Sequence, residues 1–487
     1  MKFYSSPLVL TLLWISSPAV ADGGEPSVAD AEVLATAAVL AEQGDFTAAE
    51  RLLTPHIVEL EAPVVGPYAE ARETLRRIRH DYALSAEQVL EQIRTKIPDA
   101  TLDDVERWRT QGVLQHRVID GEVAYFRREP ANLVRFSEEA KGRAGKEPVD
   151  IKRFDLPNHL AELVKLAEES DGPEVYPVRH DVTHTLTVSR KHPRIHPGAV
   201  ARCWLPFPKE YRQQRNVKLI AAAPAGAVIA PNDQPQRTIY FEQTIDDLDR
   251  PLEFKVQFQF TTSGYCPQLD SADAHAMDPS DPLVVEYTAE RLPHIAFTPR
   301  VREIVAEVAA DEPNPLLRAK KLYLWVCENM SYCAEMEYGT IASLSDKGLT
   351  TGKGDCGVQA QVFITLCRAA GIPARWQSGF ETLPRRDDMH DWAEFYVAPW
   401  GWLPADCSYG LQKHDDPRVR DFYFGHLDPY RLIVNTDYAR PLYPPSTSLR
   451  AEPNDFQRGE IEIDGHNLYF DEWDWKFEVK TTPPAEQ

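Results

Sequence analysis

The feature that most constrains this chain is a glycine-rich turn that leads directly into a helical pattern. The turn is Gly354-Asp355-Cys356-Gly357, and apolar residues then recur at helical spacing, at Val358, Val362, Phe363, Leu366 and Ala370. Gly371 is typical of the position after a helix, and Pro373 prevents the helix from continuing. The pattern therefore predicts a helix that begins at Cys356. Unpaired N–H groups and the helix dipole at such an N-terminus favour a thiolate.

Residues 390–406 predict a β-hairpin that carries a histidine and an aspartate. Residues 390–397 alternate, with His390 and Trp392 on one face and the opposite face formed by Asp391, Ala393, Phe395 and Val397. Pro399 and Gly401 favour a turn, so the returning strand brings Asp406 within a pair or two of His390. A thiol, a base and a carboxylate that orients the base are the parts of a nucleophilic triad.

Three blocks resemble the transglutaminase-like superfamily. They are the Gly354-Asp355-Cys356 turn, the later His390 and Asp406, and between them Arg368-Ala369-Ala370-Gly371-Ile372-Pro373-Ala374-Arg375. The blocks stand in the family's order within residues 281–437. The resemblance implies a papain-like α+β core with Cys356 as the nucleophile, His390 as the general base and acid, and Asp406 as the residue that orients His390. Asp388 and Asp391 are alternatives to Asp406.

Other candidate site residues follow from the requirements of acyl transfer. The oxyanion needs hydrogen-bond donors, and the backbone N–H of Cys356 is the first of them. Tyr332 and Gln359 are candidates for the second donor. Trp392 and Glu394 share the face of His390 and are candidates for the cleft wall, although a paired or solvated carboxylate is an equal alternative for Glu394.

The length of 487 residues predicts several domains. The fold class is α+β and multidomain, with an N-terminal helical and winged-helix-like region, an antiparallel β-sandwich and the catalytic core. The predicted divisions are a signal peptide at 1–21, a helical hairpin region at 22–82, a winged-helix-like module with a linker at 83–178, the β-sandwich at 179–270, the core at 275–440, and C-terminal strands that close the core at 441–487.

Several segments carry these divisions. Two capped helical patterns and an Asp120-Gly121 turn resemble a winged helix, for which we favour a packing or docking role over DNA binding. Residues 182–188 and 254–260 alternate as strands, and we expect His184 to be a core histidine rather than a ligand. Residues 203–208 resemble the β-domain that precedes the core in many bacterial transglutaminase-like proteins. Residues 333–353 predict a long loop that shapes a cleft wall.

The seven cysteines leave the disulfide pattern open. With Cys356 free, possible pairs are Cys203 with Cys266 and Cys327 with Cys333. Cys367 lies within the apolar pattern after Cys356 and is expected to be a buried thiol. No C-x-x-C spacing or calcium loop is present in the sequence, so we expect no metal and no other cofactor.

Composition and motifs together leave three functions. The formal charge of −22 disfavours nucleic acid and anionic lipid as partners. The favoured function is a cysteine hydrolase of peptide or protein amides. The alternatives are a protein-crosslinking transglutaminase and a catalytically idle scaffold. The sequence does not indicate an oligomeric state.

The N-terminus predicts export. Lys2 precedes an apolar run over residues 7–15, and an A-x-A site ends at Ala21. This is the pattern of a secretory signal peptide, and the run is too short to span a bilayer. We expect a periplasmic or extracellular protein without membrane insertion that begins at Asp22. N-terminal sequencing of the exported protein tests this, and Met1 retained on protein in the membrane fraction contradicts it.

Overall fold

The computed structural model describes residues 28–57, 66–145 and 154–484, which form two compact units. The first comprises residues 1–151 with 333–342, and the second comprises residues 152–332 with 343–487. The β-sandwich and the catalytic core, expected as separate domains, therefore lie within one unit. The expected signal peptide falls outside the described residues.

The described part of the first unit is mainly helical. Its elements are α1 (Val28–Glu42), α2 (Phe46–Leu53), η1 (Thr54–His56), α3 (Pro67–Asp81), α4 (Ala86–Arg94), α5 (Leu102–Thr110), β1 (His116–Ile119), β2 (Glu122–Tyr125), α6 (Glu129–Phe136), α7 (Glu138–Arg143) and η2 (Tyr338–Thr340). Ser85 and Thr101 each form the capping box that begins the next helix. Asp120 and Gly121, both with positive φ, form the tight turn between β1 and β2. The predicted order of two helices and a hairpin is confirmed.

The segment Cys333–Ala342 belongs to the first unit although the chain on both sides of it belongs to the second. The backbone N–H of Ala334 donates to Asn132 Oδ1 at 2.8 Å, and Asn132 Nδ2 donates back to the Ala334 carbonyl at 3.0 Å. Glu337 accepts from Arg127 Nη2 at 2.6 Å. The expectation of one long loop over 333–353 is wrong, because these contacts order the first half and α12 (Leu344–Thr351) forms the second.

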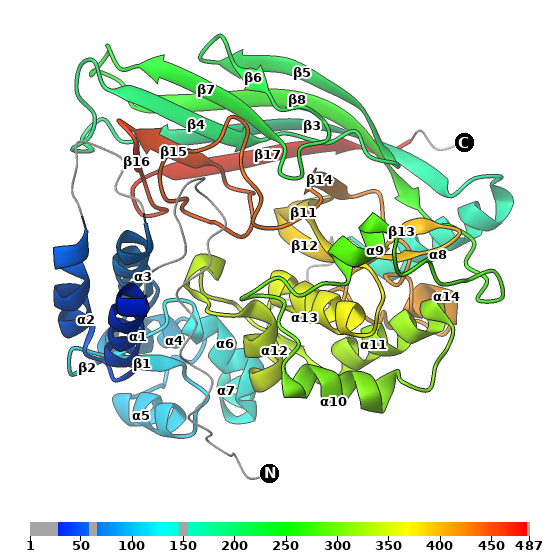
Figure 1. Cartoon of the computed structure of the whole chain (residues 1–487), viewed down its shortest axis with the longest axis horizontal. Coiled ribbons are helices and arrows are strands. Elements are labelled where there is room, and N and C mark those ends of the chain that lie inside the picture. The colour runs from blue at the N-terminus through cyan, green and yellow to red at the C-terminus, as the bar shows by residue number, and fades with distance from the viewer. Residues whose placement is uncertain (1–27, 58–65, 146–153, 485–487) are drawn as a thin grey trace. The chain divides into compact units, whose positions relative to one another are not determined.

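Two antiparallel sheets form the β region of the second unit (Figure 1). One has the order β16-β15-β4-β7-β6 and the other β17-β3-β8-β5. The strands are β3 (Glu174–Val188), β4 (Val200–Pro206), β5 (Gln214–Ala223), β6 (Val228–Ile229), β7 (Thr238–Thr244), β8 (Leu252–Tyr265), β15 (Glu460–Ile463), β16 (His466–Asn467) and β17 (Asp474–Thr482). Alternate residues of β3 and β8 point into a shared apolar core.

The C-terminal strands complete these two sheets, which corrects the expectation that they close the catalytic core. β15 pairs with β4, and β17 pairs with β3 along its whole length. Strand β17 contacts the catalytic sheet through side chains. Phe477 of β17, for example, stacks on Phe380 with ring centroids 3.9 Å apart. The C-terminal strand β17 lies here because the long strand β3 has unpaired backbone groups along one edge, and β17 pairs with them.

The catalytic part of the second unit combines a four-stranded antiparallel sheet with helices. The sheet has the order β13-β12-β11-β14, and Figure 1 shows α10 to α13 on one side of it. The elements are α8 (Leu156–Glu169), α9 (Pro282–Tyr287), α10 (Pro299–Val308), α11 (Pro315–Asn329), β9 (Ser331–Tyr332), β10 (Lys353–Gly354), α13 (Cys356–Ala369), β11 (Ala374–Leu383), β12 (Arg386–Val397), β13 (Gly401–Ala405), α14 (Pro417–Arg420) and β14 (Arg431–Asn435). The predicted helix from Cys356 and the predicted hairpin over 390–406 are confirmed.

Helix α13 is buried on every side, beyond the one apolar face that its sequence pattern predicts. Every residue from Cys356 to Arg368 is buried, and the helix packs on α10, α11, α12, β11 and β12. Gly371, with φ of 77°, follows its C-terminus as predicted. A helix enclosed in this way holds its first residue in a fixed position relative to the sheet.

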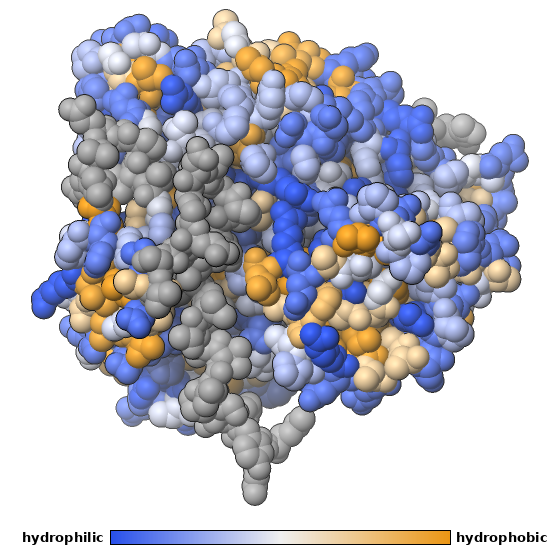
Figure 2. Space-filling model, viewed as in Figure 1, coloured by the Kyte–Doolittle hydropathy of each residue, from blue (hydrophilic) through white to orange (hydrophobic). Residues whose placement is uncertain are grey.

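The outer surface shows no large apolar patch on the face in Figure 2, where apolar residues lie in separate groups among hydrophilic ones. Within the described residues, no helix combines the length and apolar character needed to cross a membrane.

The buried histidines of β3 predict that acid destabilises the second unit. Burial lowers the pKa of His184 to about 3, and its ring lies among Phe380, Trp475 and Phe477. The unfolded chain takes up a proton near its ordinary pKa of about 6.5, whereas the folded chain does not, so stability falls as the pH drops below that value.

We expect His184→Leu to remove this loss, which amounts to about 2–3 kcal/mol between about pH 7 and pH 4.5. Urea unfolding of wild type and variant at both pH values measures it. His275→Leu, at an exposed histidine, is the control and should retain the wild-type pH dependence. An equal loss of stability in wild type and His184→Leu contradicts the prediction.

Candidate active site

Cys356 is the first residue of α13 and is held there by a tight turn. The Asp355 carboxylate accepts from the Val358 N–H at 3.2 Å and caps the helix. A Cβ on Gly354 would lie 2.4 Å from Val358 Cγ1, so only glycine fits this position. Gln359 Nε2 donates to the Gly354 carbonyl at 3.0 Å. These contacts fix the backbone on both sides of the thiol.

His390 lies on β12 and Asp406 directly follows the neighbouring strand β13, and the two side chains are hydrogen-bonded, as the hairpin predicts. The pairing of Ala393 with Ala405 sets the register of β12 and β13. His390 Nε2 lies 2.7 Å from Asp406 Oδ2, and both side chains are buried. With Nε2 bound to a carboxylate, the proton-accepting position of the imidazole is Nδ1.

Asp406 is kept ionised by groups that the sequence analysis missed. Arg431 Nη2 lies 3.2 Å from Asp406 Oδ2 and also pairs with Asp428 at 3.0 Å. The Asp406 Oδ1 accepts from Ser408 Oγ at 2.9 Å and the Tyr409 N–H at 3.1 Å. Burial alone would raise the pKa of Asp406, but the charge of His390, its hydrogen bond and Arg431 lower it to about 2. Asp406 therefore stays negative in the physiological pH range.

The thiol of Cys356 contacts Asp391 rather than a base. Its Sγ lies 3.4 Å from Asp391 Oδ2. Burial, followed by the charges of Asp391 and Asp355, raises the pKa of Cys356 well above its ordinary value. The expectation that the helix terminus lowers this pKa is therefore wrong, because burial, the largest cause, disfavours the thiolate. The raised pKa favours the protonated form of the resting thiol.

Tyr332, a candidate for the second oxyanion donor, lies beside the turn that carries Cys356. β9 pairs with β10, which sets Tyr332 next to Gly354, two residues before Cys356. The charge that a Cys356 thiolate would carry is the largest cause that raises the pKa of Tyr332, whose side chain is 44% exposed. The phenol therefore keeps its proton at neutral pH and remains able to donate. Gln359 is less suited to this role, since its amide already donates to Gly354.

Two predicted cleft residues are part of the protein interior. Trp392 is fully buried, and its indole Nε1 donates to Gln377 Oε1 at 2.7 Å. Glu394 is also fully buried: its Oε1 lies 2.7 Å from Arg212 Nη2, and its Oε2 accepts from Arg375 Nε at 2.9 Å. Glu394 therefore joins the catalytic sheet to the β region and does not line a cleft. The sequence predicted on which face of the strand Glu394 lies, but it did not predict that arginines cover this face.

The alternative orienting residues occupy other places. Asp391 contacts Cys356, and Asp388 is exposed. Asp455 and Gln457, which the sequence analysis did not select, lie beside Asp391: Gln457 Nε2 donates to Asp391 Oδ1 at 2.8 Å. No motif marks these two residues, because they come from an irregular segment more than fifty residues after β12.

All seven cysteines are free thiols in the structure. The pairs Cys203–Cys266 and Cys327–Cys333 are therefore not formed. Cys327 instead approaches Cys407, with its Sγ 3.8 Å from the Cys407 carbonyl oxygen. Cys367 is buried in α13 as predicted.

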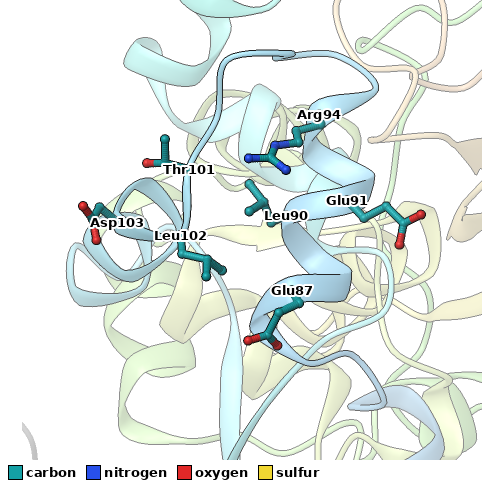
Figure 3. Close-up of a pocket in the computed structure, with 7 residues that line it drawn as sticks. All are labelled: Glu87, Leu90, Glu91, Arg94, Thr101, Leu102 and Asp103. Atoms are coloured by element: carbon teal, nitrogen blue, oxygen red, sulfur yellow. The ribbon is translucent and has the colours of Figure 1, made fainter.

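The described residues contain no cluster of three or more histidine, cysteine or acidic side chains arranged to hold a metal ion. An open groove of about 600 Å³ lies in the first unit between α4 and the start of α5 (Figure 3). Leu90 and Arg94 point towards Thr101 and Leu102, whereas Glu91 points away. None of the triad residues lines this groove.

Comparison with known proteins identifies the class of the catalytic part. Residues 302–407 match the core of the Transglutaminase-like superfamily, and this segment, which contains Cys356, His390 and Asp406, is a transglutaminase-like domain. An uncharacterized protein of Haemophilus influenzae is 26% identical over 313 residues, which cover 56% of this chain and 83% of that protein.

Two solved structures are similar at low identity. A candidate cysteine protease from Cytophaga hutchinsonii is 13% identical with a TM-score of 0.43, covering 64% of this chain and 93% of the other. The periplasmic domain of TgpA from Pseudomonas aeruginosa is 18% identical with a TM-score of 0.26, covering 54% and 95% respectively.

The buried ion cluster predicts a large effect for one substitution. We expect Glu394→Gln to destabilise the second unit by about 3 kcal/mol, because Arg212 and Arg375 lose their buried counter-charge. Urea unfolding measures the change. The matched control is Glu242→Gln, which removes a carboxylate from an exposed pair with Arg202 and should cost less than about 1 kcal/mol. Equal effects of the two substitutions contradict the prediction.

Proposed function

We propose that this protein is an exported cysteine hydrolase that cleaves peptide or other amide bonds through a thioester on Cys356. The observation that carries the proposal is the buried pair formed by His390 of β12 and Asp406, the residue after β13. Cys356 Sγ lies against Asp391, the next residue of β12. A cysteine at a helix start and a carboxylate-bound histidine on the facing sheet supply the groups that thiol catalysis requires.

The reaction begins with transfer of the Cys356 proton to His390 Nδ1, and the charge of Asp406 stabilises the resulting imidazolium. The thiolate attacks the amide carbonyl, and the Cys356 backbone N–H and the Tyr332 phenol donate to the developing oxyanion. His390 returns its proton to the leaving amine as the C–N bond breaks. The thioester remains, and a water molecule deprotonated by His390 hydrolyses it to the acid and the free thiol.

Water is favoured over an amine as acceptor because charged residues surround the histidine strand. Arg386, Asp387 and Asp388 are exposed at the start of β12, and Arg385 lies at the preceding turn. A crosslinking enzyme keeps water from its thioester and admits a lysine side chain. Hydrated charges so close to His390 support hydrolysis. Protein crosslinking is the alternative, and the net charge of −22 supports a substrate other than nucleic acid.

Product analysis tests the proposal. We expect hydrolysed peptides to exceed amine adducts when a glutamine- and glycine-rich peptide library is incubated with excess alkylamine. Cys356→Ala should abolish the products, with a loss of about 10³-fold or more. Cys367→Ala, which removes a buried thiol from the same helix, is the matched control and should retain activity.

Mass spectrometry of the products distinguishes the outcomes. An excess of amine adducts that depends on Cys356 shows a crosslinking transglutaminase. Absence of both products from every peptide and amide tested favours a scaffold role.

A further inference from the structure

A second buried carboxyl group lies behind the one that contacts the thiol. Asp391 and Asp455 are each 2% exposed. Asp391 comes from β12, whereas Asp455 comes from the segment between β14 and β15. The two side chains are hydrogen-bonded to each other. The catalytic steps proposed above use neither of them, although Asp391 Oδ2 lies 3.4 Å from Cys356 Sγ.

Three hydrogen-bond donors converge on one oxygen of Asp455. Asp455 Oδ1 accepts from Ser378 Oγ at 2.5 Å, Asn435 Nδ2 at 3.1 Å and Trp376 Nε1 at 3.3 Å. Asp391 Oδ1 accepts from Gln457 Nε2 at 2.8 Å. Donors aimed at a carboxyl stabilise its charged form, and the hydrogen bond with Asp391 acts on Asp455 in the same direction, so Asp455 is built to carry a negative charge.

Two carboxyls in contact within a buried site cannot both be ionised near neutral pH. We propose that Asp391 and Asp455 share one proton that resides on Asp391, so that the carboxyl group against the Cys356 thiol is uncharged. Asp391 donates this proton to Asp455 in a hydrogen bond, and the negative charge of the pair resides on Asp455. In this arrangement both are positioning residues for the nucleophile.

The consequence concerns the ease with which Cys356 ionises. A carboxylate at the position of Asp391 would oppose the thiolate at close range, and it is one of the groups that raise the pKa of Cys356. A neutral carboxyl removes this repulsion. Among the described residues, other ionisable groups near the thiol include Asp355, which caps α13, Tyr332 on β9, and the His390–Asp406 pair. Asp388 of β12 acts on Tyr332. Burial raises the pKa of Asp455, which is consistent with a pair that retains one proton.

The experiment measures the protonation of Cys356 directly, through the rate of iodoacetamide alkylation as a function of pH, with peptide mapping to separate Cys356 from the other thiols. In Asp455→Asn the new amide can donate to Asp391, which then becomes a carboxylate. We expect the alkylation rate at about pH 7 to fall at least tenfold and the apparent pKa of Cys356 to rise by about one unit or more.

Asp391→Asn is the matched control, since its amide donates to Asp455 as the protonated carboxyl does. Its alkylation profile should stay within about threefold of wild type, and Asp391→Asn combined with Asp455→Asn should restore the rate lost in Asp455→Asn alone. A merely structural role would not produce this rescue. Circular dichroism confirms that each variant is folded.

Two results overturn the proposal. One is an unchanged profile in folded Asp455→Asn. The other is alkylation accelerated more than about tenfold by Asp391→Asn, which would show that Asp391 is charged in the wild type. If Asp455→Asn does not fold, the Asp391→Asn measurement tests the proposal by itself. The proposal rests on Cys356 being the nucleophile, but alkylation does not require turnover. If the variants show the expected alkylation rates but the protein cleaves no amide, the proposed function is refuted and the proposal of a shared proton still holds.

Discussion

The catalytic part of this protein depends on keeping one buried carboxylate charged. Asp406 has no exposed surface, and a carboxylate in such a place is stable only with cations and hydrogen-bond donors around it. His390, Arg431, Ser408 and the Tyr409 backbone supply them. The charge of Asp406 in turn orients His390 and stabilises its protonated form. The base of the proposed reaction therefore depends on a cation from β14 that never contacts the thiol.

A second constraint is the enclosure of α13. Because helices cover it on one side and the sheet on the other, Cys356 has a fixed position but a protonated thiol, since burial disfavours the thiolate. The same enclosure that aligns the nucleophile therefore opposes its ionisation. This opposition makes the charge state of the neighbouring Asp391 important, and it explains why a partner carboxyl such as Asp455 can influence chemistry that it does not touch.

Much of the site was predictable from local patterns. A turn of the type Gly354-Asp355-Cys356 followed by an apolar repeat requires a helix start, and strict alternation around His390 requires a strand. The register that brings Asp406 to His390 follows from the short turn at Pro399 and Gly401. Glu394 and Trp392 were predicted less well, because strand alternation assigns a face to each side chain but does not say what covers that face.

The sequence by itself determined the elements and the pairing of His390 with Asp406, since helix starts, strand alternation and tight turns are encoded by residues close together in the chain. Only the tertiary structure decided the groups that control the charges of the triad. Arg431 reaches Asp406 from another strand, and Asp455 reaches Asp391 from an irregular segment. Burial and electrostatic coupling depend on distances in space between residues far apart in the chain, and no local pattern records those distances.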